Sequence, residues 1–201
     1  MDAVQLLKDQ HDAVDRLFAM IEEADDGARK AALFVELADA LAAHVTIEED
    51  QFYPAVKAKQ TADMLLEATE EHLAIKRVLA DLLGLTPTDP RFTAKLKVLQ
   101  EEVTNHAREE EEAKLFPKVR RLLDADELEA LGRELGVLDR RICARDAGLS
   151  QADPAAHGGA RAGDEIIVLV VFVQQQRVDP ARLPGGQRAR GCVAVSYTHL
   201  T

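Results

Sequence analysis

The sequence predicts an all-α protein: an up-down-up-down four-helix bundle with a short fifth helix and an irregular C-terminal tail. Apolar residues recur with helical period in four successive stretches, and short segments rich in Gly, Asp and Pro separate these stretches. Up to about residue 138 the chain consists mainly of Ala, Leu, Glu, Asp, Lys and Arg, a composition typical of helical proteins. Because the connections are short, neighbouring helices are expected to run antiparallel.

The first two predicted helices span about residues 2–24 and 28–58. In the first, His11 lies on a stripe of apolar residues spaced by threes and fours. The second carries His44 and Glu48 on the face that is expected to point inward. Each helix therefore places a histidine among the residues that should form the core.

The third and fourth predicted helices span about residues 61–83 and 91–123, and a shorter fifth helix, 126–138, is expected to cap the bundle. One glycine and two prolines interrupt the chain between the third and fourth helices. His72 lies on the apolar face of the third helix and His106 on that of the fourth. All four long helices thus carry one inward histidine.

The four histidines are expected to meet at one level of the bundle. Each lies about 12 to 17 residues along its helix from the turns that join it to its neighbours. At a rise of about 1.5 Å per residue, these offsets agree to within one or two helical turns. The topology therefore predicts a single layer of imidazoles.

Two of the helices carry similar segments that end in a proline. The first is HVTIEEDQFYP at residues 44–54, and the second is HAREEEEAKLFP at residues 106–117, with one extra residue. A histidine and a carboxylate one helical turn apart lie on the same face of a helix. Each half of the bundle thus supplies a histidine and a carboxylate to the same layer.

The polar layer is best explained by metal binding. A lone histidine on an apolar helix face is more often a core residue with a satisfied hydrogen bond than a ligand. Four imidazoles and two carboxylates buried together would, however, cost several kcal/mol for each unpaired group. A mixed set of imidazole and carboxylate ligands favours a dinuclear site of iron or manganese, and iron is the better match.

The order of these motifs resembles the hemerythrin-like (HHE) cation-binding family over about residues 4–123. The resemblance implies that the histidines are terminal ligands of two Fe ions, a non-haem di-iron centre, and that one carboxylate from each repeated segment bridges the ions. The implied ligands are His11, His44, Glu48, His72 and His106, with Glu110 or Glu111 as the second bridge.

The choice between Glu110 and Glu111 depends on the local helix geometry. In a regular α-helix Glu110 is on the same face as His106, whereas Glu111 is rotated by about 140°. Alignment of the two segments from their prolines instead favours Glu111, as do the family's oxygen carriers, provided that a π-bulge absorbs the extra residue. The sequence favours Glu111 and keeps Glu110 as the alternative.

The sequence departs from the oxygen carriers at Lys76, where they have a second third-helix histidine. This lysine is expected to extend its ammonium group to solvent rather than to bind metal. Tyr53, nine residues after His44, is expected to face away from the site and to serve packing. Three further glutamates are expected on the solvated faces of the helices: Glu49, Glu109 and Glu112.

Charge and composition exclude several classes of partner. Residues 1–138 carry 17 basic and 30 acidic side chains, and such an acidic surface repels nucleic acid and anionic lipid. The first residues contain charges and no continuous apolar segment, so no signal peptide is predicted. Both cysteines, Cys143 and Cys192, follow the predicted bundle. A cytoplasmic protein without a membrane segment is therefore expected.

The chain divides into a bundle at residues 1–138 and a tail at residues 139–201. The first part holds nine lysines, whereas the second holds none but has eight arginines and is enriched in Gly and Pro. We expect no regular fold for the tail. Its last residues, VSYTHLT, resemble a translated sequencing adaptor, so some or all of residues 145–201 is hypothesised to be non-native sequence.

The sequence supports three functions to different degrees. The leading interpretation is a non-haem di-iron protein that binds dioxygen or a related small oxidant, in sensing, storage or detoxification. A second is a peroxidase-like or oxidase-like di-iron enzyme, and a third is a metal-free helical interaction module. The pattern does not identify the protein partner, and it does not decide between carrier, sensor and enzyme.

Overall fold

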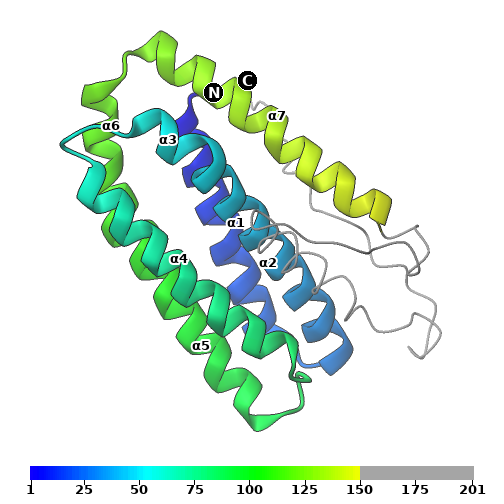
Figure 1. Ribbon diagram of the computed structural model, residues 1–201. Helices are drawn as coiled ribbons and strands as arrows, with labels where there is room; N and C mark the ends of the chain where they lie inside the picture. Colours follow the sequence, from blue (N-terminus) through cyan, green and yellow to red (C-terminus); the bar gives the residue numbers. More distant parts are fainter. Residues whose placement is uncertain (150–201) are drawn as a thin grey trace, which may run out of the picture.

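The structure is a computed structural model that describes the backbone of residues 1–149 and the side chains of residues 1–142. Its elements are α1 (Ala3–Glu23), α2 (Gly27–Ile47), η1 (Glu48–Phe52), α3 (Tyr53–Val56), α4 (Ala62–Leu83), α5 (Pro90–Thr104), η2 (Asn105–Leu115), α6 (Phe116–Leu122) and α7 (Ala125–Leu149). The described residues contain no strand, which confirms the predicted all-α class (Figure 1). The predicted tail lies outside the described residues from residue 150 onward.

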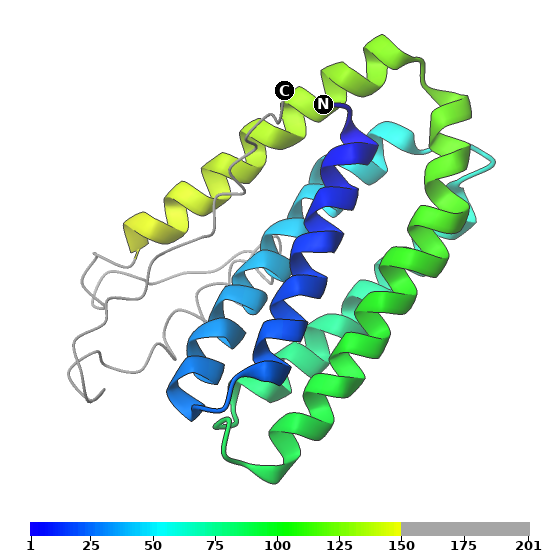
Figure 2. The same cartoon turned by 180° about the vertical axis from the view of Figure 1, so that it is seen from behind.

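Four antiparallel rods form the bundle (Figures 1 and 2). Both η elements are π-helical turns inside longer helices, so α2, η1 and α3 form the second rod, and α5, η2 and α6 form the fourth. Aspartates begin three of the rods by accepting hydrogen bonds from backbone N–H groups of the first turn, as helix N-caps do. The up-down-up-down topology is therefore as the sequence predicts.

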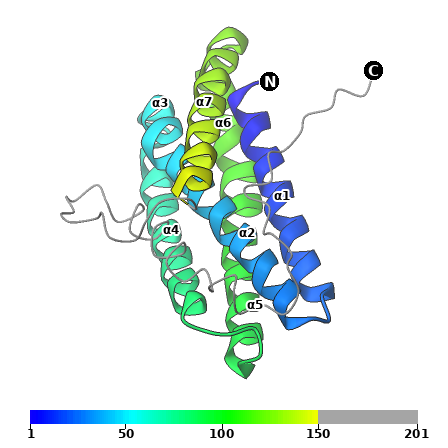
Figure 3. The ribbon, with the colours of Figure 1, turned by 90° about the vertical axis from the view of Figure 1, so that its right-hand side faces the viewer.

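The fifth helix differs from its prediction in length and position. α7 continues past residue 138 to Leu149, and it lies against α1 and α2 along the side of the bundle rather than over its end (Figure 3). Gly132 permits this approach, because a Cβ atom there would lie 2.6 Å from the Met1 carbonyl oxygen. None of the described helices is both long and apolar enough to cross a membrane.

The core consists of two apolar clusters separated along the bundle by a polar layer. The cluster nearer α7 contains Leu7, Ile47, Ala68 and Leu115 among its members. The cluster nearer the α1–α2 turn contains Val14, Leu41, Ile75 and Val103 among its members. On every rod the histidine lies between a residue of one cluster and a residue of the other, so the imidazoles share one level as expected.

Candidate metal centre

The polar layer brings four histidines from four rods together with two glutamates. All six side chains are buried: His11, His44, Glu48, His72, His106 and Glu111. Each imidazole turns its Nε2 atom towards the bundle axis, where it meets the Nε2 atom of a neighbour or a carboxylate oxygen. Ligand-type atoms therefore face one another inside an otherwise apolar core.

The first half of the layer consists of His11 and His44 with two carboxylates. Their Nε2 atoms are 3.2 Å apart. Oε2 of Glu48 lies 3.2 Å from the Nε2 atom of His44, and Oε2 of Glu111 lies 3.3 Å from that of His11. The four donor atoms lie within 4.8 Å of one another, close enough to surround one metal ion.

The second half consists of His72 and His106, whose Nε2 atoms are 2.9 Å apart. Oε2 of Glu48 is 3.2 Å from the Nε2 atom of His72, so this carboxylate belongs to both halves. Oε2 of Glu111 lies 3.7 Å from the Nε2 atom of His106, in addition to its contact with His11. Both glutamates thus lie between the two histidine pairs.

The Nδ1 atom of each histidine has a separate acceptor on the outer side of the layer. The pairs are His11 with Glu112 at 3.0 Å, His44 with Gln10 at 2.9 Å, His72 with Glu49 at 2.9 Å and His106 with Glu71 at 2.7 Å. An Nδ1–H group that donates to such an oxygen leaves Nε2 free to bind a metal and fixes the orientation of the ring. The outer partners therefore orient all four imidazoles so that each can bind a metal through its Nε2 atom.

Cationic side chains hold two of these outer carboxylates. Lys8 lies 3.0 Å from Glu112, and Arg108 pairs with the same carboxylate. The ammonium group of Lys76 lies 3.0 Å from both oxygens of Glu49. Lys76 therefore stands outside the ring of Nε2 atoms, and its partner is a carboxylate rather than solvent.

The electrostatics of the layer favour positive charge. Burial alone would lower the pKa of His106, but Glu111, Glu48 and Glu71 outweigh it and raise that pKa to about 10. The neighbouring carboxylates likewise raise the pKa of His11 despite its burial. At His44 burial dominates and lowers the pKa to about 3. Burial and the neighbouring Glu48 also raise the pKa of Glu111, so without a metal the imidazoles of His11 and His106 and this carboxyl group all favour binding of protons.

The donor set fits a pair of metal ions. Both oxygens of Glu48 and Oε2 of Glu111 are buried and accept no well-formed hydrogen bond from the described residues. Neutral imidazoles would point their Nε2 lone pairs at each other across 3.2 Å in one pair and 2.9 Å in the other. Two ligand atoms that each lie about 2.1 Å from one ion, with an angle of about 90° between their bonds, are about 3 Å apart. The Nε2 atoms in both histidine pairs have this spacing.

π-helical turns explain why Glu111 rather than Glu110 joins the layer. The N–H group of Phe116 donates to the carbonyl of Glu111, five residues earlier, so η2 absorbs one extra residue. Glu111 then lies on the same face as His106, whereas Glu110 turns outward and pairs with Lys114 at 2.6 Å. The structure contains the bulge on which the sequence argument for Glu111 depends.

Each π turn ends two residues before a proline. Tyr53 precedes Pro54 and donates its N–H to the carbonyl of Glu48, also five residues earlier. A proline within a helix has no N–H group and its ring clashes with the carbonyl four residues before it. A wider turn relieves that clash, so the two prolines account for the position of both π turns.

The expectation that Tyr53 faces away from the site is wrong. Its hydroxyl donates to Oε1 of Glu111 at 3.0 Å and lies 3.4 Å from the Nε2 atom of His72, and its ring stacks on that histidine. The expectation assumed a regular helix, and the π turn between His44 and Tyr53 brings the phenol back to the inner face. Tyr53 is therefore a seventh polar side chain of the layer.

The expectation that Glu49 and Glu112 lie on solvated faces is also wrong, because they accept from His72 and His11. Glu109 is exposed, as predicted. Gln10 and Glu71 were not identified from the sequence at all. A weak signal existed, because each outer partner is adjacent in the chain to a residue of the layer, with Gln10 before His11 and Glu71 before His72.

A family model for the hemerythrin HHE cation-binding domain matches residues 2–139. The chain belongs to this family. The structure is similar to that of a hemerythrin HHE cation-binding domain-containing protein from Mycobacterium kansasii, with a TM-score of 0.68 and 25% identity, over 86% of this chain and 99% of that one. The family is defined by cation binding, and the His/Glu layer of this member has the groups that can hold metal ions.

A curated relative from Nostoc sp. is named a DNA nickase. It is 26% identical over 142 residues, which are 71% of this chain but only 40% of the length of that protein. The similarity therefore concerns a part of the cyanobacterial protein.

Proposed function

We propose that this HHE-domain protein is a non-haem di-iron protein that binds dioxygen or a related small oxidant. The observation that supports it best is the division of the layer into two histidine pairs that share Glu48. A site for one ion would need only one such pair. Mixed imidazole and carboxylate donors suit iron, and a carboxylate between two donor groups is the usual bridge of a dinuclear site.

In the proposal each histidine pair would hold one iron ion, and the carboxylates of Glu48 and Glu111 would be ligands shared by the two ions. His11 and His44 have both carboxylates within reach, whereas His72 and His106 additionally have the hydroxyl of Tyr53 nearby. When bound in the reduced state, two iron ions supply two electrons to a small oxidant.

The residues around the layer would protect and tune this chemistry. The two apolar clusters exclude bulk water from both ends of the site. The phenol of Tyr53 holds a proton on its oxygen, directed at Oε1 of Glu111. Burial and the nearby carboxylates Glu48 and Glu111 raise the pKa of this phenol well above its usual range in the metal-free protein. Tyr53 is therefore the nearest proton donor to the bridging carboxylate among the described residues.

An enzymatic role is the second candidate, because Lys76 takes the place of a ligand histidine and leaves one iron with fewer nitrogen donors. An iron with fewer ligands reacts more readily with peroxide, nitric oxide or dioxygen. Catalytic consumption of hydrogen peroxide by the iron-loaded protein, at many turnovers per chain, would support the enzyme. A single equivalent consumed would support a binding protein.

We further propose a cytoplasmic protein without a nucleic-acid partner. The excess of acidic side chains in residues 1–138 opposes binding to phosphate backbones. The name of the Nostoc relative makes this testable with supercoiled plasmid. We expect the full chain, loaded with iron, to leave the plasmid intact, and nicking at stoichiometric protein would contradict the proposal.

The decisive experiment is an iron count on the purified full chain, combined with its visible spectrum. The protein is loaded with ferrous iron without oxygen, freed of excess metal and exposed to air. We expect two irons per chain and a visible absorption band that appears on exposure. A fully helical protein that retains no iron would support the metal-free interaction module instead.

A further inference from the structure

α4 and η2 pack against each other on one side of the polar layer. A small cavity of about 10 Å³ lies there and extends to the buried carboxylate of Glu111. Its lining consists of Met64, Glu67, Ala68, Glu110, Glu111 and Leu115. Glu111 is in contact with the Nε2 atoms of His11 and His106, so this cavity touches the polar layer itself.

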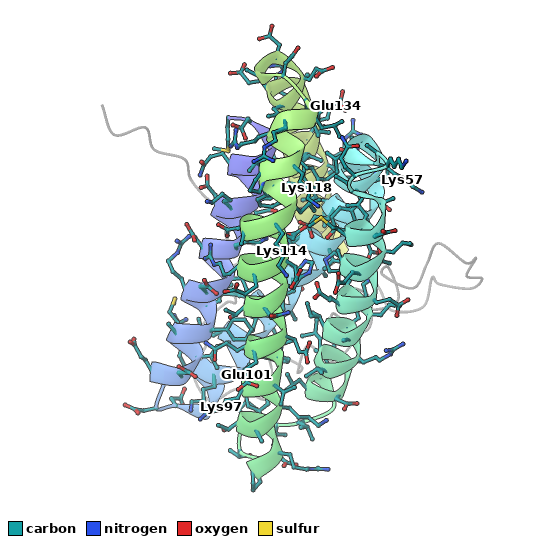
Figure 4. All side chains as sticks on the ribbon, turned by 90° about the vertical axis from the view of Figure 1, so that its left-hand side faces the viewer. Lys57, Lys97, Glu101, Lys114, Lys118 and Glu134 are labelled. Atoms are coloured by element: carbon teal, nitrogen blue, oxygen red, sulfur yellow. The ribbon has the colours of Figure 1, made fainter. Side chains whose placement is uncertain are left out.

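A wider groove of about 490 Å³ lies outside the cavity on the same face. Met64, Glu67 and Glu110 line both spaces and therefore form the partition between them. Lys114, Lys118 and Arg121 line the outer groove only. Figure 4 shows Lys114 and Lys118 one turn apart on the η2–α6 side of this face.

Two other sides of the layer are closed by ion pairs. Between α1 and η2, Arg108 pairs with Asp12, Asp15 and Glu112. Between η1 and α4, Lys76 pairs with Glu49, which in turn contacts His72. On the α4–η2 side, Glu71 contacts the Nδ1 atom of His106. Beside Glu111, however, this side is lined by Met64 and by Glu110, whose ion pair with Lys114 lies on the helix surface.

We propose that this opening between α4 and η2 is the route by which small molecules reach the metal centre, with Met64 and the Glu110–Lys114 pair as its gate. The proposal rests on the di-iron function above. Methionine is unbranched and flexible, and Met64 is half-buried, so rotation of its side chain can join the groove to the cavity on a fast timescale. Lys114 can likewise exchange Glu110 for an incoming ligand.

The size of the route defines the class of ligand. A cavity of about 10 Å³ is close to the space that a single water molecule requires. Ligands of two or three atoms can therefore pass with small side-chain movements, whereas an organic substrate cannot. The three cationic side chains in the groove attract small anions, although Glu67 and Glu110 partly oppose them. The route therefore suits ligands of two or three atoms, the size of the small oxidant in the proposed function.

Azide binding to the oxidised, iron-loaded full chain tests the route, with stopped-flow absorbance to measure both rate constants. A gate lies on the path in both directions, so altering it should change the association and dissociation rate constants by the same factor and leave the dissociation constant unchanged. We expect Met64→Trp to slow both by about tenfold and Met64→Ala to accelerate both. The matched control is Leu66→Trp, because Leu66 is 70% exposed on the same helix.

A second variant avoids any change to the packing at Met64. Glu110→Gln removes one carboxylate from the partition and frees Lys114, so azide should associate faster, and added salt should reduce the gain. Unchanged rates in the Met64 variants and in Glu110→Gln, with two irons bound, would overturn the route. Failure of the wild-type chain to bind iron would instead overturn the proposed function, so the two failures can be distinguished.

Discussion

In the proposed di-iron centre, Glu111 is the second carboxylate that the two irons share. It is buried beside His11 and His106, whereas the neighbouring Glu110 pairs with Lys114 at the surface. We expect Glu111→Gln to lose at least one of the two irons, because a neutral amide replaces the charge that a bridge supplies. Glu110→Gln should retain both. Iron content by atomic emission, with circular dichroism to check folding, compares the two, and equal iron contents would contradict the assignment.

The hydroxyl of Tyr53 offers a second test at the residue scale, in the metal-free protein. Tyr53→Phe removes the donor that lies 3.0 Å from Oε1 of Glu111. A buried acceptor that loses its partner costs about 1–3 kcal/mol, so the free energy of unfolding should fall by that amount in urea titrations. The control is Thr46→Val, whose half-buried hydroxyl bonds a carbonyl of its own helix and whose loss should cost about 0.5 kcal/mol or less. Equal losses would argue against the contact.

The sequence predicted the inner residues of the layer but not the outer ones. Histidines on apolar faces, such as His11 and His72, stand out because burial of an imidazole needs an explanation. Glu49 and Glu112 do not stand out, because a glutamate on a charged helix face normally faces solvent. Their role depends on which neighbouring helix lies opposite, and helix periodicity does not contain that information.

At the scale of the element, the π turn in η2 places Glu111 and can be tested by deletion. Removing the exposed Glu109 should shorten the π-helical segment and place Glu111 four residues after His106, the spacing that His44 and Glu48 already have in the second rod, so the layer should survive. We expect two irons and a melting temperature within about 5 °C of the wild type.

Deletion of the equally exposed Glu102 is the matched control, because it lies in the regular helix α5. Its loss rotates the preceding part of α5 by about 100° and turns Phe92, Leu96 and Leu99 away from the core. This variant should lose iron and stability. If the Glu109 deletion were as damaging as the Glu102 deletion, the extra residue would have a role other than the bulge.

The helices could be predicted because apolar periodicity persists through the whole length of each rod. The π turns leave only indirect sequence signals, because hydrogen bonds of the backbone decide between α and π geometry. These signals are the prolines at positions 54 and 117 and, for η2, the extra residue in the segment 106–117. The length and position of α7 were also missed. Its path along α1 depends on the close approach at Gly132, which is a property of the assembled bundle.

For the whole molecule, the metal ions would join four rods that are distant in the sequence. The polar layer separates the two apolar clusters. At the level of the layer, the helices are therefore not held together by apolar packing. Without metal, burial opposes the charged forms of both the imidazoles and the carboxylates of the layer, and protons rather than metal ions must reduce the negative charge there. The polar layer is therefore the weakest part of the metal-free bundle and the part that iron should strengthen most.

Removal of iron should accordingly lower the stability of the whole bundle. A ligand that binds only the folded state at about a thousand times its dissociation constant stabilises it by about 4 kcal/mol. We expect the chelated protein to remain helical but to melt well below the iron-loaded form, with the difference measured by calorimetry. Glu111→Gln should reduce that difference because it weakens binding, while Glu110→Gln should preserve it. Identical melting curves with and without iron would mean that the ions do not connect the rods.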